Sequence, residues 1–233
     1  MIECHATLWR NIDERVDAVS GGWKHPLFLW RVLTTYLHLL KVFWPHRHDF
    51  DVMVCGYPGQ FDVFLARLLC WWLRKPLVWD VFMSIYLIAC ERRLDRVNRL
   101  AVEMLRRIEW LACRLPDLLI LDTADYVRWF YVVHGVTEDR FRLVPTGADS
   151  SRFKPLPVRS RHASPFRIMY YGSFIPNHDV PTIVEAAYLL APYTEIRFEL
   201  VGDGPDRAYC ETMAQLYQLQ NVDFVGWISQ DEL

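Results

Sequence analysis

Residues 167–206 constrain the fold of this chain more than any other stretch. A short apolar run at 168–171 stops at Gly172, and a turn-rich loop follows. Apolar residues then recur at helical spacing, which predicts a helix with one buried face; they are Val180, Ile183, Val184, Ala187, Leu190 and Ala191. A second apolar run at 196–201 ends at Gly202. Strand, helix and strand joined by short loops predict a βαβ unit with parallel strands.

The two loops of this unit form a candidate ligand site. Asp179 is placed to cap the helix, and Pro181 falls in its first turn, where a missing N–H costs little. Both loops follow the carboxyl ends of their strands, the edge at which open α/β sheets bind ligands. Gly-x-Gly without a third glycine is a weak phosphate signal. The Gly202-Asp203-Gly204 turn is therefore either a simple turn or part of a ligand pocket.

The rest of the chain repeats the alternation of strand and helix. Strands are expected at 50–55, 76–79, 117–121 and 141–144, and helices at 23–44, 60–73, 91–115 and 123–133. This alternation predicts a parallel sheet. Residues 151–164, rich in proline, serine and arginine, are expected to link two α/β domains at 1–150 and 165–233. The cleft between the domains is the expected site.

Composition excludes several classes of protein. The apolar fraction of 52% suits a globular chain and is too high for disorder. The net charge of −2 gives no electrostatic argument for nucleic acid as a partner. The 6 cysteines lack zinc spacing and no signal peptide opens the sequence, which favours free thiols and a cytoplasmic protein. The run at 46–49, His-Arg-His-Asp, is expected to be a loop rather than a metal site.

Three apolar stretches bear on membrane contact. Residues 27–44, 61–73 and 77–90 are short or interrupted by charge, whereas a spanning helix needs about 20 apolar residues. One interpretation is that all three stretches are buried helix and strand. The alternative is that residues 27–44 lie on a membrane surface, with nearby aromatic side chains at the level of the headgroups; these side chains are Trp23, Trp30, Phe43 and Trp44. The arginines between 92 and 107 form either a solvated helix face or a contact with anionic lipid.

From residue 75 onward, the motifs of the chain resemble those of glycosyltransferase family 4, also called glycosyl transferases group 1. They are KPLVWD at 75–80, LVPTGADSSRFKP at 143–155, YYGSFIPNHDVPTIVEAA at 170–187, FELVGDGPDR at 198–207 and VDFVGWISQDEL at 222–233. The resemblance implies an α/β chain of GT-B type, with two Rossmann-like parallel-sheet domains facing a cleft. It also implies retaining transfer from a nucleotide diphosphate sugar to a lipid-linked or saccharide acceptor, as in polysaccharide biosynthesis, without metal or other cofactor.

The resemblance places the nucleotide sugar on the second domain and the acceptor on the first. The donor-binding residues that it implies are Gly172, Ser173, His178, Gly202, Asp203 and Gly204. Ser173 and His178 stand where the family has an arginine and a lysine, so neither supplies a permanent charge. Diphosphate binding is then expected to depend on the backbone N–H groups of 172–175 and on the helix start near Val180.

Asp80 is the candidate catalytic residue of the first domain, as a contact to acceptor or donor sugar. It is otherwise a helix cap or one half of an ion pair. Asp122 or Thr123 is expected to cap the helix after the third strand, and Asp122 is expected to be a cap rather than a catalytic acid. The family's histidine after this strand has no counterpart, because Val81, Phe82 and Met83 follow.

The ends of the chain depart from the family pattern. The family's pair of sugar-binding glutamates would fall beyond Leu233, and residues 229–232 read as a capping box that opens a further helix. We therefore expect a fragment, incomplete in both domains and inactive by itself. The alternative is a degenerate subunit that binds a sugar nucleotide without catalysis. A Rossmann dehydrogenase is disfavoured, because the chain lacks the GxGxxG fingerprint.

Overall fold

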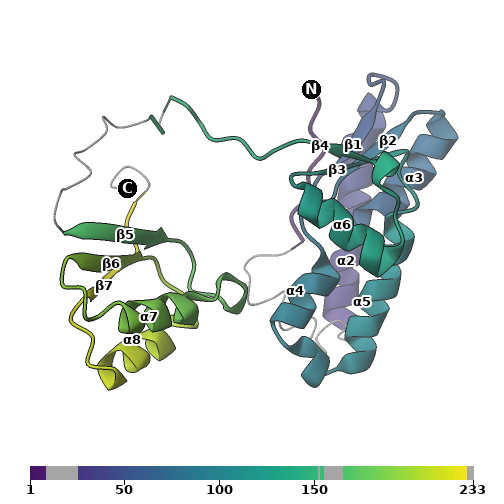
Figure 1. The fold of residues 1–233 in the computed structure, drawn as a ribbon. Helices are drawn as coiled ribbons and strands as arrows, with labels where there is room; N and C mark the ends of the chain where they lie inside the picture. The colour runs from purple at the N-terminus through teal and green to yellow at the C-terminus, as the bar shows by residue number, and fades with distance from the viewer. Residues whose placement is uncertain (9–25, 152, 155–164, 230–233) are drawn as a thin grey trace. The chain divides into compact units, whose positions relative to one another are not determined.

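The computed structural model describes residues 1–8, 26–151, 153–154 and 165–229 (Figure 1). The chain divides into two compact units, Met1–Gly147 and Ala148–Leu233. Most of the expected linker at 151–164 lies outside the described residues, as do Trp23 and residues 230–232 of the expected capping box.

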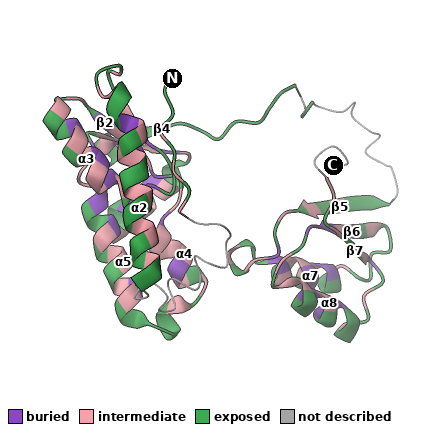
Figure 2. Ribbon diagram, turned by 180° about the vertical axis from the view of Figure 1, so that it is seen from behind, coloured by how far each residue is buried: buried purple, intermediate pink, exposed green. Residues whose placement is uncertain are grey.

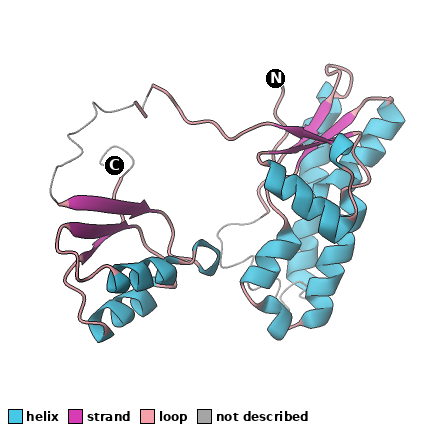
Figure 3. Cartoon of the chain, viewed as in Figure 1, coloured by secondary structure: helices cyan, strands magenta, loops and turns pink. Residues whose placement is uncertain are grey.

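The first unit is built on a parallel sheet, as predicted. Its strands lie in the order β1 (Met53–Cys55), β2 (Leu77–Asp80), β3 (Leu118–Leu121) and β4 (Phe141–Leu143). Helix α2 (Pro26–Phe43) precedes the sheet, and α3 (Asp62–Leu73), α4 (Ile85–Glu91), α5 (Arg99–Ala112) and α6 (Ala124–His134) connect its strands (Figure 3). The carboxyl ends of the four strands therefore meet at one edge of the sheet.

Local chemistry explains where these helices begin. Ser84 opens α4 by accepting a hydrogen bond from the Leu87 N–H at 3.0 Å. Asn98 and Thr123 cap α5 and α6 in the same way. Thr123, and not Asp122, is thus the cap after β3.

Two predictions for the first unit need correction. The single helix expected at 91–115 is broken, because Arg93 adopts a left-handed conformation with φ of 55° and Asn98 starts a new helix. The strand expected at 50–55 is only three residues long. It lies at the edge of the sheet, and both Val52 and Val54 are exposed.

A buried polar cluster joins three helices of this unit. The Glu109 carboxylate accepts hydrogen bonds from the Ser84 hydroxyl at 2.5 Å and from the Ile85 N–H at 2.8 Å. His134 Nε2 lies 3.0 Å from the same carboxylate, and the side chains of Glu109 and His134 are both fully buried. Since an unpaired buried polar group is costly, this cluster fixes α4, α5 and α6 relative to one another.

The second unit contains the predicted βαβ arrangement. Strands β5 (Phe166–Tyr171), β6 (Ile196–Val201) and β7 (Val222–Gly226) form a parallel sheet in that order. Helices α7 (Val180–Leu189) and α8 (Arg207–Leu216) connect them and cover the same face of the sheet (Figures 1 and 3). Helix α7 ends at Leu189, so Ala191 does not continue its buried face as predicted.

The opposite face of this sheet carries exposed apolar side chains, Met169, Tyr171 and Val225. In the part of the chain that the structure describes, no helix is long and apolar enough to cross a membrane.

Candidate functional site

The loop after β5 is fixed by a buried aromatic side chain. Phe174 is fully buried and packs edge-on against Tyr170 and beside Phe224, with ring centroids 5.9 and 6.4 Å away. Its backbone N–H donates to the carbonyl of Asp203, and its carbonyl accepts from the N–H of Asp206, both at 3.0 Å. The loop after β5 is thus tied, through side chain and backbone, to the turn after β6.

Gly202 and Gly204 allow this close approach. A Cβ added to Gly202 would lie 1.9 Å from the carbonyl oxygen of Gly172. One added to Gly204 would lie 2.5 Å from the carbonyl oxygen of Phe174. Only residues without a Cβ fit at such contacts. Both glycines therefore have a structural role in joining the two loops, whether or not they also touch a ligand.

Ser173 and His178 belong to one small polar group. His178 Nδ1 lies 2.9 Å from the Ser173 carbonyl oxygen, and the Tyr170 hydroxyl donates to the same oxygen at 2.9 Å. Because a carbonyl oxygen only accepts, Nδ1 carries the hydrogen in this contact. Nε2 is then the ring nitrogen that can accept a hydrogen bond, on an exposed side chain.

The backbone N–H groups of 172–175 are less available than the sequence suggested. Those of Gly172, Phe174 and Ile175 donate to Val201, Asp203 and Ser173, respectively. Among the described residues, only the Ser173 N–H of this loop has no acceptor. An anion over this loop would therefore meet one free amide.

The helix start also differs from the prediction. Asp179 precedes α7 in a left-handed conformation with φ of 48°, and its side chain makes no capping hydrogen bond to the backbone. The carboxylate instead accepts from the Thr182 hydroxyl at 2.7 Å. This exposed negative charge at the helix start opposes anion binding there.

Sequence reasoning did not identify Arg207 as a site residue. Its Nη1 donates to the carbonyl of Gly202 at 3.0 Å, and its Nε donates to Glu211 at 2.8 Å. Arg207 therefore places a cation beside the turn after β6. Its position at the first turn of α8, directly after the Gly-x-Gly turn, is the signal that could have identified it.

Asp80 lies at the carboxyl edge of the other sheet, at the end of β2. Burial raises the pKa of its carboxyl group above the ordinary range. A hydrogen bond from the Phe82 N–H opposes this shift, and the negative charge of Asp122 adds to it. Asp80 ends β2 and Asp122 follows β3, its neighbour in the sheet, so both carboxylates belong to the same edge of this sheet.

Three further residues at this edge were missed. Phe82 has a left-handed backbone with φ of 52°, which is uncommon for an aromatic residue. Its ring meets that of Tyr57 edge to face, with centroids 5.4 Å apart, and both side chains are partly exposed. Gln60 is buried and donates to the Met83 carbonyl at 2.9 Å, which holds the turn. Strained backbone beside exposed aromatic rings is a pattern that concentrates at functional sites.

Replacing Asp80 with asparagine is expected to raise the stability of the first unit slightly at neutral pH. A raised carboxyl pKa means that ionisation costs folding free energy as pH rises through it. The neutral amide avoids this cost and can still accept from the Phe82 N–H. The gain should vanish below about pH 4, where the unfolded carboxyl group is also protonated.

Urea unfolding at pH 7 and at low pH checks this, with Asp125→Asn as the exposed control. A loss of stability at pH 7 would mean that the carboxylate of Asp80 is a structural partner.

Metal ligands do not gather among the described residues. No group of three or more histidine, cysteine, aspartate or glutamate side chains in residues 1–8, 26–151, 153–154 and 165–229 could hold a metal ion. Within the histidine-containing run at 46–49, His46 lies 3.5 Å from Asp49.

The structure therefore brings six of the predicted residues together within the second unit, and the seventh belongs to the first unit. The loops after β5 and β6 hold Gly172, Ser173, His178, Gly202, Asp203 and Gly204 at the carboxyl edge of the second sheet. Asp80 occupies the equivalent edge of the first sheet. The expected cleft between the two domains stays a prediction.

Comparison with known proteins gives matches among solved structures. Neither a scan against protein-family models nor a search of curated proteins found a match. The structure of Anabaena HepE in complex with UDP is 15% identical, with a TM-score of 0.60 over 84% of this chain and 53% of that one. Sucrose-phosphate synthase from Thermosynechococcus elongatus is 21% identical, with a TM-score of 0.55 over 86% and 51%. The lipopolysaccharide outer core galactosyltransferase WaaB is 14% identical, with a TM-score of 0.53 over 87% and 50%.

These neighbours are GT-B glycosyltransferases, and the chain spans about half of their length. At these identities the likeness concerns the fold. The chain is an α/β protein with parallel sheets that match part of the GT-B glycosyltransferase fold.

Proposed function

We propose that this chain belongs to a glycosyltransferase that transfers a sugar from a nucleotide diphosphate sugar. The observation that carries the proposal is the pair of glycine-tethered loops at the carboxyl edge of the β5–β7 sheet. Backbone packed this closely lets a ligand approach the edge without side chains in between. The matched Anabaena HepE structures are complexes with UDP and with UDP-glucose, which favours a nucleotide sugar as the ligand.

The finer features of the proposal rest on the motif resemblance to glycosyltransferase family 4. They are transfer with retention of configuration, a lipid-linked or saccharide acceptor, a role in polysaccharide biosynthesis and independence from metal. The proposed place of action is the cytoplasm, at the inner face of the membrane. In this reaction the donor diphosphate is the leaving group, so the donor loops must stabilise its charge.

The polar group around Ser173 would receive the diphosphate. It offers the free Ser173 amide, the Ser173 hydroxyl and the His178 imidazole, with Arg207 beside the neighbouring turn. Asp80 is proposed as the acceptor-side residue, and the exposed rings of Tyr57 and Phe82 would provide an apolar surface for a sugar face.

The second candidate is a degenerate subunit that binds a sugar nucleotide without transferring the sugar. It is favoured by the engaged amides of the donor loop and by the carboxylate of Asp179 at the start of α7, since both weaken an anion site. Titration calorimetry with UDP and UDP-glucose tests the feature that both candidates share. Sugar transfer to a saccharide or lipid-linked acceptor then separates the two, and no binding of any nucleotide sugar would overturn both.

Replacing His178 with lysine is expected to tighten nucleotide-sugar binding about five-fold at pH 8. Lysine places a full charge near the diphosphate, and one unit charge at about 4 Å contributes about 1 kcal/mol in water.

Calorimetry at pH 8 measures the effect, and His48→Lys adds the same charge to the other unit as a control. An unchanged affinity in the His178 variant would show that this side chain lies away from the donor.

A further inference from the structure

Helices α2 and α3 lie side by side in the first unit and run in the same direction. The Tyr36 hydroxyl in α2 donates to Asp62, at the start of α3, at 2.7 Å. Eight residues further along, Trp44 stacks on Trp72 at the end of α3, with ring centroids 5.7 Å apart. Contacts at both ends of α3 thus join it to α2 and to Trp44, and the two helices form one layer on the surface of the unit (Figure 2).

The outer face of this layer is apolar. One side of α2 is partly buried, through Val32, Leu39 and Phe43, whereas its other side faces solvent (Figure 2). The exposed apolar residues of the layer are Leu27, Leu29, Trp30, Leu33, Leu37, Trp44, Leu68, Trp71 and Trp72. Trp71 has 74% of its surface exposed, and Leu27 has 71%. Large apolar groups gathered in this way mark an interaction surface.

The charge of the layer is predominantly positive. Residues 26–48 and 62–75 contain one acidic residue, Asp62, and they carry Arg31, Lys41, Arg47, Arg67, Arg74 and Lys75. The chain as a whole has a net charge of −2, so the net +5 of this layer leaves a net −7 on all other residues. The outer layer is thus the positive part of an acidic chain, which matches an anionic partner.

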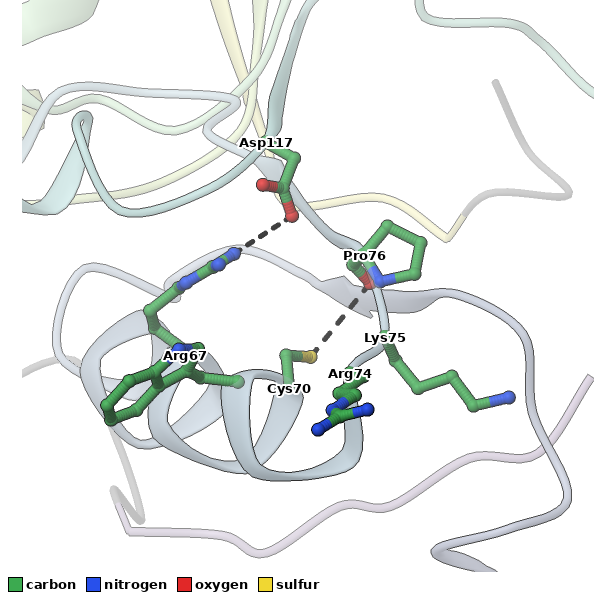
Figure 4. Close-up of a pocket in the computed structure, with 7 residues that line it drawn as sticks. Arg67, Cys70, Arg74, Lys75, Pro76 and Asp117 are labelled. Carbon is green, nitrogen blue, oxygen red and sulfur yellow. Dashed lines mark hydrogen bonds and ion pairs between the residues drawn. The ribbon is translucent and has the colours of Figure 1, made fainter.

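A pocket of about 360 Å³ adjoins the apolar surface at Trp71 (Figure 4). Arg67 forms one wall of the pocket, and its Nη1 donates to the Asp117 carboxylate at 2.9 Å. Arg74 and Lys75 form another part of the lining, and Lys75 Nζ also lies 3.7 Å from the exposed Asp51 carboxylate. Arg74 has no carboxylate partner among the described residues, and its side chain is exposed. The pocket lies at the amino ends of β2 and β3, the edge opposite Asp80.

We propose that the outer faces of α2 and α3, with Trp44, dock this protein onto an anionic phospholipid bilayer. The apolar side chains enter the boundary between headgroups and acyl chains, with α2 parallel to the membrane plane. Tryptophan is the side chain most suited to that boundary, because it is apolar with one polar N–H. The pocket beside Trp71 takes a lipid phosphate on Arg74 and Lys75. The docking surface uses the first unit alone and stands independently of the proposed donor site.

Vesicle co-sedimentation tests the proposal on the full chain. We expect binding to vesicles of phosphatidylcholine and phosphatidylglycerol in equal parts, weaker binding to phosphatidylcholine alone, and weakening by salt. The double variant Lys41→Gln/Arg74→Gln should lose about five-fold in partitioning for each cation removed. The double variant Leu37→Gln/Trp71→Gln should lose binding even at low salt.

Two matched controls separate this surface from others. Arg96→Gln/Arg99→Gln removes two cations near the start of α5, and Leu216→Gln removes an exposed apolar residue of α8. Both should bind vesicles as the wild type does. Equal losses in the controls, or no binding to anionic vesicles, would overturn the proposal. So would a change from dimer to monomer in Leu37→Gln/Trp71→Gln with vesicle binding unaltered, since the face would then join two copies of the chain.

Discussion

Replacement of Gly202 by alanine is expected to unfold the second unit. The added Cβ would lie 1.9 Å from the carbonyl oxygen of Gly172, and both groups are backbone at the ends of paired strands. Gly202 also has a φ of 133°, a conformation that residues with a Cβ rarely adopt. No side-chain rotation relieves this contact, so β5 and β6 must separate at their carboxyl ends. We expect a loss of more than about 4 kcal/mol, which is a large part of the stability of a small domain.

Hydrogen exchange measured by mass spectrometry shows which unit of the variant has unfolded. Peptides from β6 and α8 should lose protection in the variant, whereas peptides from β2 and β3 in the first unit should keep it. Gly56→Ala is the matched control, because a Cβ at that position meets nothing within 4 Å. Full protection of β6 in Gly202→Ala would show that the two loops can move apart at little cost.

The expected loss also bears on how the glycines contribute to function. The sequence left open whether the Gly202-Asp203-Gly204 turn is only a turn or part of a ligand pocket. The contacts of Gly202 with Gly172 and of Gly204 with Phe174 explain why glycine is needed at both positions, even without a ligand. A binding defect in a glycine variant therefore carries information about the donor only if the second unit is shown to remain folded. Substitutions at His178, whose side chain is exposed, avoid this ambiguity.

Local patterns predicted much of the fold correctly. The βαβ unit at 166–201 follows from apolar periodicity and turn residues within the segment, so a reading of the sequence finds it. The break in the helix expected at 91–115 was missed, because Arg93 gives no sequence signal of a left-handed conformation. Asp179 was expected to cap α7, but its carboxylate binds the Thr182 hydroxyl instead. Such choices between two nearby hydrogen-bond partners depend on backbone geometry.

The candidate site was predictable only in part, for a related reason. The strand ends and their glycines placed six of its residues at one sheet edge, since parallel strands align their carboxyl ends. The pairing of Tyr57 with Phe82 joins the loops after β1 and β2, and no spacing rule links them. Gln60 likewise holds the Met83 carbonyl across 23 residues of sequence. These contacts depend on tertiary structure, which local periodicity does not encode.

Replacement of Glu109 by alanine is expected to destabilise the first unit by about 3–5 kcal/mol. The carboxylate is the common partner of the Ser84 hydroxyl, the Ile85 N–H and His134 Nε2, at 2.5, 2.8 and 3.0 Å. Alanine removes this shared acceptor, so all three donors lose their partner at once. The side chains of Ser84 and His134 are buried, so solvent cannot replace the lost hydrogen bonds without opening the packing of α4, α5 and α6.

Glutamine at this position separates the loss of hydrogen bonds from the loss of volume. Its carbonyl oxygen can still accept from the Ile85 N–H, so Glu109→Gln should lose well under half as much stability as Glu109→Ala. Urea unfolding followed by tryptophan fluorescence reports on the correct unit, because Trp227 is the only one of the 10 tryptophans outside Met1–Gly147. If alanine and glutamine destabilise equally, the charge of the carboxylate rather than its hydrogen bonds holds the three helices together. If neither destabilises, α4 and α6 are fixed by apolar packing alone, and the polar cluster serves another purpose than stability.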